Sequence, residues 1–301
     1  MIEVEVDGPA ARVDDPMTSG EEAAELATRY GLTRIDRNPS FTEYVRRLWR
    51  RRAFVVELAK ARAYRRHQSN YLGQLWAVLD PLLLAGSYFL IFGLLLRTDR
   101  GVDNFIGFLT VGIFIYSFIA ATTTSGAKSI TGNQNLIRGV RFPRAALPVS
   151  VAMSEILTLL PALAVLLVIL LVTGERLTWK LALLPASVVV MFVFCIGLSL
   201  LAARAVASWR DAANFIPTGV RLMRYASGVM FSIAAYAGHG LIGTLMQYQP
   251  VAVYLELVRS CLLAETAMTP TLWAFAGGWA LVFVGAGIVL FWRAEHRYGG
   301  D

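Results

Sequence analysis

The sequence predicts an all-α integral membrane protein with six transmembrane helices, and two observations lead to this prediction. Of its 301 residues, 56% are hydrophobic and 16% are charged, whereas a soluble domain carries about 25% charged residues. The apolar residues also form runs of about 20 residues, the length a helix needs to cross the hydrocarbon core of a bilayer. These runs cover roughly 77–97, 105–126, 146–173, 181–203, 218–237 and 271–292, within a transmembrane domain of 77–292.

The distribution of basic residues predicts the orientation. If the amino terminus is cytoplasmic, the inner flanks of the spans hold twelve Lys and Arg residues and the outer segments hold five. The positive-inside rule therefore places both termini in the cytoplasm, including the carboxyl-terminal residues 293–301. The first 76 residues contain no apolar run that could act as a signal peptide. Because topology explains the net charge of +7, no nucleic-acid partner is expected.

The residues before the first span form two parts of opposite charge. Residues 1–36 carry nine acidic and three basic residues, which predicts a largely flexible cytoplasmic tail over 1–40. Residues 37–66 carry ten basic and two acidic residues, and their apolar residues recur near helical spacing. This pattern predicts a basic amphipathic helix in the headgroup plane, within a segment 41–76 and with Ser40 as N-cap; packing on a partner protein is a compatible alternative. Its arginines are Arg46, Arg47, Arg50, Arg51 and Arg52.

Polar and small residues follow one side of the predicted fifth span. Such a stripe in a membrane helix faces protein or a water-filled path, so it predicts either a substrate path or a helix-packing surface. Asp80 and Glu155 lie near the cytoplasmic ends of their spans, where pairing with arginines and a transport role are both open. The residues of the stripe, with Arg224 beside them, are Asn214, Thr218, Arg221, Tyr225, Gly228 and Ser232.

The segment 237–268 is too long for a turn and too broken to span the bilayer. Glycines open it, Gln249-Pro250 interrupts it, and a helical pattern resumes over 251–263. This pattern predicts a pair of short re-entrant helices on the outer side. They would form a lid or gate over 237–265 that includes Gly240, Gly243, Met246 and Pro250.

The inner loop 128–144 contains four basic residues and no acidic one. A short apolar ridge lies among polar residues in this loop. The pattern predicts either an anchor to anionic lipid or a short helix inserted into a cytoplasmic partner. The ridge consists of Leu136, Ile137, Val140 and Phe142, and the polar residues are Asn133, Asn135, Arg138 and Arg141.

Residue types that nucleotide, metal or glycosyl chemistry needs are absent or scattered. A P-loop places Gly before its Lys, but Lys60, Lys128 and Lys180 follow Ala or Trp, so no ATP hydrolysis by that route is expected. The three histidines have no metal-ligand spacing, and the acidic residues of the outer loops are not clustered in the sequence. We therefore expect no catalytic residue, no metal site and no cofactor bound by this chain. Cys195 and Cys261 are expected to be buried and unpaired.

Four stretches, in order and at matching topological positions, resemble the membrane subunit of type-2 ABC exporters of the O-antigen and teichoic acid kind. The resemblance covers about 41–297. With its acidic tail and its Arg/Ala-rich composition, the chain is most similar to the actinobacterial (mycobacterial) exporter of lipid-linked galactan. The stretches are Arg65 to Trp76 with Pro81, Asn135-Leu136-Ile137 with Phe142-Pro143-Arg144, Arg210-Asp211, and Gln249-Pro250 with Tyr254 and Arg259.

The resemblance implies a homodimer in the bacterial plasma membrane. Two copies of a separate ATPase, which binds ATP and Mg, would grip the coupling segment around 133–142. The cargo would be a polyprenyl-diphosphate-linked glycan, and the arginines between Arg46 and Arg52 would meet its diphosphate, since guanidinium groups offer a planar fork of donors. A type-2 exporter of lipid or drug, a stand-alone flippase and a glycan-synthesising enzyme remain alternatives. The first and fifth helices would line the channel with Tyr88, Phe92, Asn214, Thr218, Arg221, Arg224, Tyr225 and Ser232.

Overall fold

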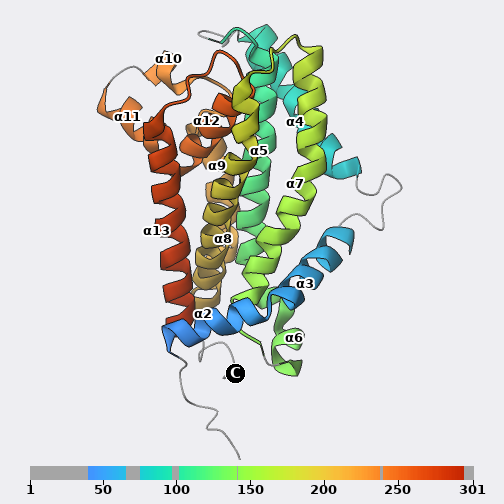
Figure 1. The fold of residues 1–301 in the computed structure, drawn as a ribbon, viewed down its shortest axis with the longest axis vertical. Helices are drawn as coiled ribbons and strands as arrows, with labels where there is room; N and C mark the ends of the chain where they lie inside the picture. Colours follow the sequence, from blue (N-terminus) through green and yellow to red (C-terminus); the bar gives the residue numbers. More distant parts are fainter. Residues whose placement is uncertain (1–39, 66–74, 97–101, 141, 238–239, 295–301) are drawn as a thin grey trace, which may run out of the picture. The chain divides into compact units, whose positions relative to one another are not determined.

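The computed structural model describes residues 40–65, 75–96, 102–140, 142–237 and 240–294 (Figure 1). Within these residues every regular element is a helix, and the residues from Ser40 onward form one compact unit. The predicted acidic tail lies outside the described residues. So do Arg141 of the predicted coupling segment and most of the stretch between Arg65 and Trp76.

Five helices of the described residues are long and apolar enough to cross a membrane. They coincide with the first, second, third, fourth and sixth predicted runs. In Figure 1 the last four run side by side, and the first crosses behind them at an angle. In chain order they are α4 (Trp76–Tyr88) with its π-helical continuation η2 (Phe89–Leu95), α5 (Phe105–Ala127), α7 (Ala146–Val172), η4 (Trp179–Leu183) with α8 (Leu184–Ser208), and α13 (Pro270–Ala294).

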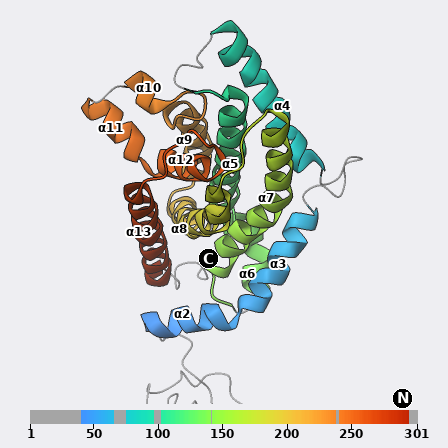
Figure 2. The same ribbon diagram turned by 45° about the horizontal axis from the view of Figure 1, so that its top comes forward.

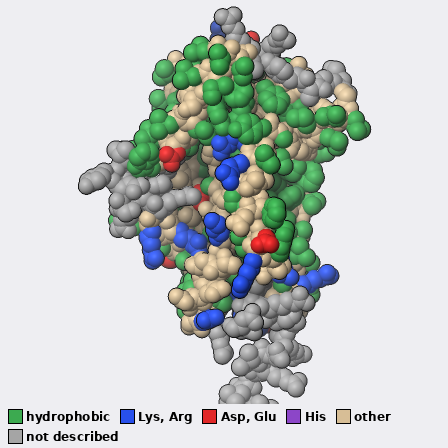
Figure 3. Space-filling model, turned by 180° about the vertical axis from the view of Figure 1, so that it is seen from behind, with side chains coloured by type: hydrophobic (Ala, Val, Ile, Leu, Met, Phe, Trp, Pro, Cys, Tyr) green, Lys and Arg blue, Asp and Glu red, His purple; other side chains and the backbone are tan. Residues whose placement is uncertain are grey.

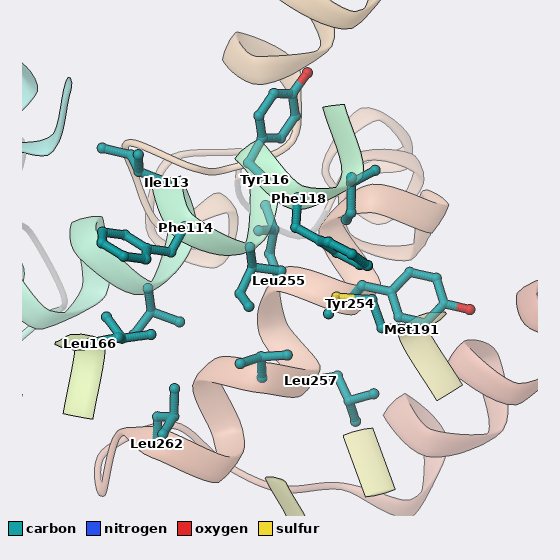
Figure 4. Close-up of a cluster of buried hydrophobic side chains, with 14 of the residues drawn as sticks. Ile113, Phe114, Tyr116, Phe118, Leu166, Met191, Tyr254, Leu255, Leu257 and Leu262 are labelled. Carbon is teal, nitrogen blue, oxygen red and sulfur yellow. The ribbon is translucent and has the colours of Figure 1, made fainter. Parts of the chain in front are cut away.

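Helix α5 forms the centre of the bundle. Its span is 78% buried, whereas the other four spans are between 6% and 39% buried and leave broad apolar faces for lipid or another chain. Side chains of α5 meet those of α7, α8 and the short helix α12 (Pro250–Leu262) in the hydrophobic core (Figure 4). Figure 4 labels Ile113, Phe114, Tyr116, Phe118, Leu166, Met191, Tyr254, Leu255, Leu257 and Leu262.

Small residues let α8 and α13 approach closely. A Cβ atom added at Gly197 would collide with the backbone of Phe283 and Val284, and one added at Gly287 would lie 2.9 Å from Leu200 Cβ. Membrane helices lack a hydrophobic drive to associate in lipid, so such backbone contact supplies the van der Waals attraction instead.

The predicted fifth span is not one helix. Helix α9 (Ala212–Ala226) ends eleven residues before the expected boundary at 237, and the chain is non-helical over 227–232 before α10 (Ile233–Ala237). Gly228 has a φ of 71°, a left-handed conformation that interrupts a right-handed helix. The prediction of a continuous helix over 218–237 is therefore wrong, and Ser232 does not share the α9 face with Asn214.

The segment 237–268, predicted to lie on the outer side, contains the expected short helices. Helix α11 (Leu241–Tyr248) is largely exposed, while α12 after Gln249 is buried along almost its whole length. In α12 the Tyr254 hydroxyl donates a 2.7 Å hydrogen bond to the carbonyl of Ala276 on α13. Helix α12 is thus part of the protein core, and a gate role for the segment stays a prediction.

The predicted interface helix consists of two helices, α2 (Phe41–Arg50) and α3 (Arg52–Arg65), that meet at Arg51. The predicted N-cap is confirmed, because Ser40 Oγ accepts a 3.3 Å hydrogen bond from the amide of Glu43. Helix α2 lies across the end of the bundle, where Phe41 meets Trp292 of α13 edge to face at 5.8 Å (Figure 1). Helix α3 packs along α7 instead.

Candidate functional site

Arg224 of α9 lies between two tyrosines from other helices. Its Nη1 donates a 3.4 Å hydrogen bond to the Tyr88 hydroxyl of α4, and its Cζ lies 5.2 Å from the centroid of the Tyr116 ring of α5. The Tyr116 hydroxyl in turn donates to the carbonyl of Val220 on α9. The predicted residues Tyr88 and Arg224 are therefore brought together, and a cation–π contact and two hydrogen bonds connect α4, α5 and α9.

The other residues predicted to line a channel are spread along the same helices. Asn214, Thr218, Arg221 and Tyr225 are exposed on α9, where the Thr218 hydroxyl donates 3.2 Å to the carbonyl of Asn214. Phe92 of η2 meets Tyr88 edge to face at 5.9 Å. Figure 3 shows a row of Lys and Arg side chains along the face seen from behind. The exposed or half-exposed arginines from the end of α8 to the end of α9 are Arg204, Arg210, Arg221 and Arg224.

The break after α9 is held by two side chains from the outer segment. Gln249 Nε2 donates a 2.7 Å hydrogen bond to the carbonyl of Ala226, the last residue of α9. Arg259 of α12, which is 3% exposed, donates to the carbonyls of Gly228 at 2.9 Å and Val229 at 3.0 Å. Its Nη2 also donates to Phe108 at 3.2 Å. These hydrogen bonds satisfy the carbonyls at the break, which have no helical N–H donor in their apolar surroundings.

The arginines predicted to meet a diphosphate all lie at the surface of α2 and α3. Arg47 pairs with Glu43 at 2.5 Å, and the Arg52 guanidinium lies 5.5 Å from the Trp49 ring, which is 68% exposed. Arg62 of α3 differs, because its Nε and Nη2 are buried and have no hydrogen-bond partner in the described part of the chain. Burial lowers the pKa of this guanidinium. The exposed arginines are Arg46, Arg47, Arg50, Arg51 and Arg52.

The predicted coupling segment is folded as η3 (Thr131–Asn133) and α6 (Gln134–Gly139). Asn133 Nδ2 donates 2.7 Å to the carbonyl of Ser129, which holds the segment against the end of α5. Phe142 packs against Phe54 of α3 with ring centroids 5.1 Å apart. Asn135 and Arg138 are exposed, while Leu136 and Ile137 pack on the cluster around Tyr44, Leu147 and Phe291. The segment is thus tied to α3.

The residues predicted for an outer gate lie on the two short helices. Gly240 precedes α11 and is exposed, Gly243 is buried within α11, and Met246 and Pro250 are half-buried. Trp279 of α13 holds the end of α11, because its Nε1 donates 3.0 Å to the carbonyl of Tyr248.

Acidic residues that are distant in the sequence, in loops predicted to lie on the outer side, meet in the fold. Glu175 accepts from Asn104 Nδ2 at 2.9 Å and from the Ala264 amide at 2.8 Å, and Glu265 accepts from the Asp103 amide at 2.7 Å. Burial and the carboxylates of Asp103 and Glu175 raise the pKa of Glu265. These bonds tie the end of α12 to the start of α5. Sequence spacing alone did not reveal this cluster.

A cavity of about 330 Å³ lies between α4, α5 and α7, and Arg224 of α9 forms part of its wall. The two acidic residues singled out in the sequence, Asp80 and Glu155, both line it. Glu155 is 6% exposed, whereas Asp80 is exposed.

The sequence profile of the ABC-2 type transporter family matches residues 55–263. The chain belongs to this family. Membership implies a membrane location and an ATPase partner. The matched residues include the helices that carry Tyr88, Arg224 and Arg259.

Relatives of this chain are named as permease proteins of O-antigen export systems. The chain is 25% identical over 207 residues to the O-antigen export system permease protein RfbA of Myxococcus xanthus, covering 69% of this chain and 79% of the relative. It is 31% identical over 169 residues to an O-antigen export system permease protein RfbA of Klebsiella pneumoniae, covering 56% of this chain and 64% of the relative. A second Klebsiella pneumoniae protein of the same name matches equally well.

Proposed function

We propose that this chain is the channel-forming membrane subunit of an ATP-driven exporter. The exporter moves a polyprenyl-diphosphate-linked polysaccharide from the cytoplasm to the outer side of the bacterial plasma membrane. The observation that carries the proposal is the arginine-bearing face of α9, where Arg224 is held between Tyr88 and Tyr116. Membership of the ABC-2 family and relatives named O-antigen export permeases support it.

The arginines suit the diphosphate end of such a cargo. A guanidinium offers several donors in one plane, so it binds phosphate oxygens in pairs and stays charged in the membrane. In this proposal the exposed arginines of α2 and α3 collect the diphosphate at the cytoplasmic surface, and Arg221 and Arg224 receive it on α9. The aromatic rings of Tyr88, Phe92 and Tyr225 provide surfaces along which sugar rings slide.

The chain acts as a homodimer in this proposal. Only 6% of the Val78–Leu95 span is buried, and the polar face of α9 is exposed in one copy. An exposed polar face is unfavourable against lipid, so a second copy that covers α4 and α9 and encloses a water-filled path removes this cost. The outer helices around Gly240 and Gly243 then close the path as a gate.

Two copies of an ATPase subunit bind ATP and Mg, and this chain binds neither. Their closure moves the coupling segment around Leu136, Ile137 and Arg138. The Phe54–Phe142 contact carries that motion into α3, and α3 packs along the membrane helix α7. The termini of this chain lie on the same cytoplasmic side. A cell-wall galactan precursor is the specific cargo that we propose.

Reconstitution tests the proposal. The chain and its ATPase are placed together in liposomes, and the appearance of undecaprenyl-diphosphate-linked glycan on the far side is followed with and without ATP. We expect transport only with ATP and both subunits. The double variant Arg221→Gln with Arg224→Gln lowers transport but leaves the yield of dimer unchanged, whereas a loss of assembled protein would assign these arginines to packing.

The same reconstitution separates the alternatives. Transport by this chain without the ATPase would make it a flippase. Chemical turnover of the lipid-linked sugar without ATP would make it an enzyme. Transport of phospholipid or drug, but not of glycan, would place it among the other type-2 exporters.

A further inference from the structure

Arg62 of α3 carries two donor nitrogens that no group in the described part of the chain accepts from. Its Nε and Nη2 are buried and unpaired, although the residue as a whole is half-buried. A guanidinium keeps its charge in proteins, and a charged donor that is buried without an acceptor is unfavourable. Arg62 is therefore a candidate for binding a negatively charged group from outside the chain.

The carboxylates of the same two helices are engaged with other cations. Glu43 pairs with Arg47, and Glu57 pairs with Lys60 at 2.8 Å. Residues 41–65 hold eight basic residues and these two acidic ones. The excess of positive charge on α2 and α3 favours an anion as the acceptor that Arg62 lacks.

Arg62 lies beside a membrane-length helix and close to one end of it. Phe54 of α3 packs against Phe142, four residues before α7 begins, so α3 starts level with that end of α7. Arg62 follows Phe54 by eight residues, or about 12 Å of helix. Because α3 is inclined to α7 on the outside of the bundle, Arg62 lies within this distance of the level of Phe142 (Figure 1, Figure 2).

This level is close to the phosphate layer of a bilayer. Helix α7 has 27 residues and is about 40 Å long, which exceeds the hydrocarbon thickness of about 30 Å, so its ends reach the headgroups. Tyr64 of α3 is 61% exposed and Trp49 of α2 is 68% exposed, and both residue types are enriched at this interface. A half-buried arginine there can turn its guanidinium toward the headgroups while its stem stays packed.

A lipid phosphate suits Arg62 better than a carboxylate of a soluble partner. A soluble protein would meet the end of the bundle where α2 and α6 lie, whereas Arg62 lies farther along α7 (Figure 1). The donors of a guanidinium form a planar fork that binds two phosphate oxygens at once. We propose that Arg62 binds the phosphate group of a membrane lipid.

Two lipids could supply this phosphate, a phospholipid of the leaflet and the polyprenyl diphosphate of the proposed cargo. The site itself requires only the membrane location that family membership implies. Helix α3 also carries Phe54, which contacts Phe142 of the predicted coupling segment. A phosphate on Arg62 therefore anchors to the bilayer the helix that meets this segment.

Lipid binding to the full chain, purified in detergent and measured by native mass spectrometry, tests the site. The probes are dioleoylphosphatidylglycerol, undecaprenyl diphosphate and dioleoylglycerol, which has no phosphate. We expect Arg62→Gln to bind at least one of the two phosphate lipids about tenfold more weakly than the wild type, the effect of hydrogen bonds to a charged group. Binding of dioleoylglycerol should not change. Arg62→Lys, which keeps the charge but loses the fork, should give an intermediate affinity.

Lys60→Gln is the matched control. It removes the same charge from the same helix, but the Lys60 ammonium is exposed and already pairs with Glu57. Its affinity for the phosphate lipids should stay within about twofold of the wild type, since an exposed pair contributes little.

Melting temperatures of the lipid-free variants keep the test interpretable. If Arg62 has no acceptor in the protein, Arg62→Gln removes an unpaired buried charge and melts no lower than the wild type. Phosphatidylglycerol should then raise the melting temperature of the wild type and of Lys60→Gln more than that of Arg62→Gln.

The outcomes separate a phosphate site from a diffuse charge and from a structural arginine. Weaker binding of both phosphate lipids by Arg62→Gln supports the site, and weaker binding of one of them supports it and identifies the source. Unchanged binding of both, or an equal loss in Lys60→Gln, overturns it. A lower melting temperature of lipid-free Arg62→Gln also overturns it, because a protein acceptor then holds the guanidinium. Weaker co-purification of the ATPase with unchanged lipid binding assigns Arg62 to a protein partner instead. Because no glycan transport is measured, failure here leaves the proposed function untouched.

Discussion

The Arg259 guanidinium donates a 2.9 Å hydrogen bond to the carbonyl of Gly228 and thereby ties the buried helix α12 to the break after α9. A guanidinium carries five N–H donors and no acceptor, so it can satisfy several carbonyls at once. Here it serves three, on Phe108, Gly228 and Val229. Arg259 is therefore one of the side chains that fix the end of α9 relative to α5 and α12, together with Gln249 and Tyr116.

Replacing Arg259 by Gln should destabilise the folded protein strongly. Each buried carbonyl that loses its donor costs about 1–3 kcal/mol, and a shorter amide cannot reach all three. Thermal unfolding of the purified chain in detergent measures the loss. Arg293→Gln is the matched control, because Arg293 is exposed at the end of α13. Equal melting temperatures for the two variants would refute this role of Arg259.

Gly112 of α5 provides the space for the Arg259 side chain. A Cβ atom at this position would collide with the Arg259 guanidinium and lie 2.9 Å from the Val229 carbonyl. Gly112→Ala should therefore cost about 1–3 kcal/mol, as expected for overpacking. Gly86→Ala on α4 is the control, since no atom lies within 4 Å of its added Cβ. Equal melting temperatures for the two alanine variants would show that the close approach at Gly112 does not contribute to stability.

The contact between Phe142 and Phe54 should matter for coupling more than for folding. An aromatic pair contributes about 0.5–1.5 kcal/mol, so Phe142→Ala should lower ATP-driven transport about two- to tenfold in the reconstituted system. Phe41→Ala removes a comparable contact with Trp292 at the same end of the bundle and should leave transport near the wild-type rate. Unchanged transport by Phe142→Ala would remove the coupling role.

Glu265 should make stability depend on pH. Its pKa is raised in the folded state, first by burial, so the folded protein holds this proton to higher pH than the unfolded chain does. The resulting stability is present below the ordinary pKa of Glu and is lost as pH rises through the raised value. Glu265→Gln keeps an acceptor for the Asp103 amide. The melting temperature of this variant should depend less on pH between the ordinary pKa of Glu and the raised pKa of Glu265. Glu57→Gln, at an exposed position of α3 far from Glu265 in the sequence, should not reduce this dependence.

Features that depend on local composition could be predicted from the sequence. Five of the six apolar runs are membrane-length helices because the thickness of the bilayer requires about 20 apolar residues. The N-cap at Ser40 and the short helices around Pro250 follow from local chemistry in the same way. The exposure of Arg46 to Arg52 agrees with their helical spacing.

Contacts between distant residues could not be predicted. The helical periodicity of the sequence extends the predicted fifth span through Gly228. This periodicity does not indicate that Arg259, 31 residues later, donates to the carbonyl of Gly228 and so stabilises a break in the helix. The cavity that gathers Asp80, Glu155 and Arg224 requires the packing of three helices around α5, and the carboxylate cluster of Glu175 and Glu265 requires the ends of α7 and α12 to meet.

The sequence by itself determined the membrane class, the family and most of the spans, because these depend on hydrophobicity and local order. The tertiary structure decided where the predicted fifth span breaks, that α12 is buried, and which charged side chains share a site. The physical reason is that a buried polar group must find its partner in space, and that partner is fixed only when the helices pack.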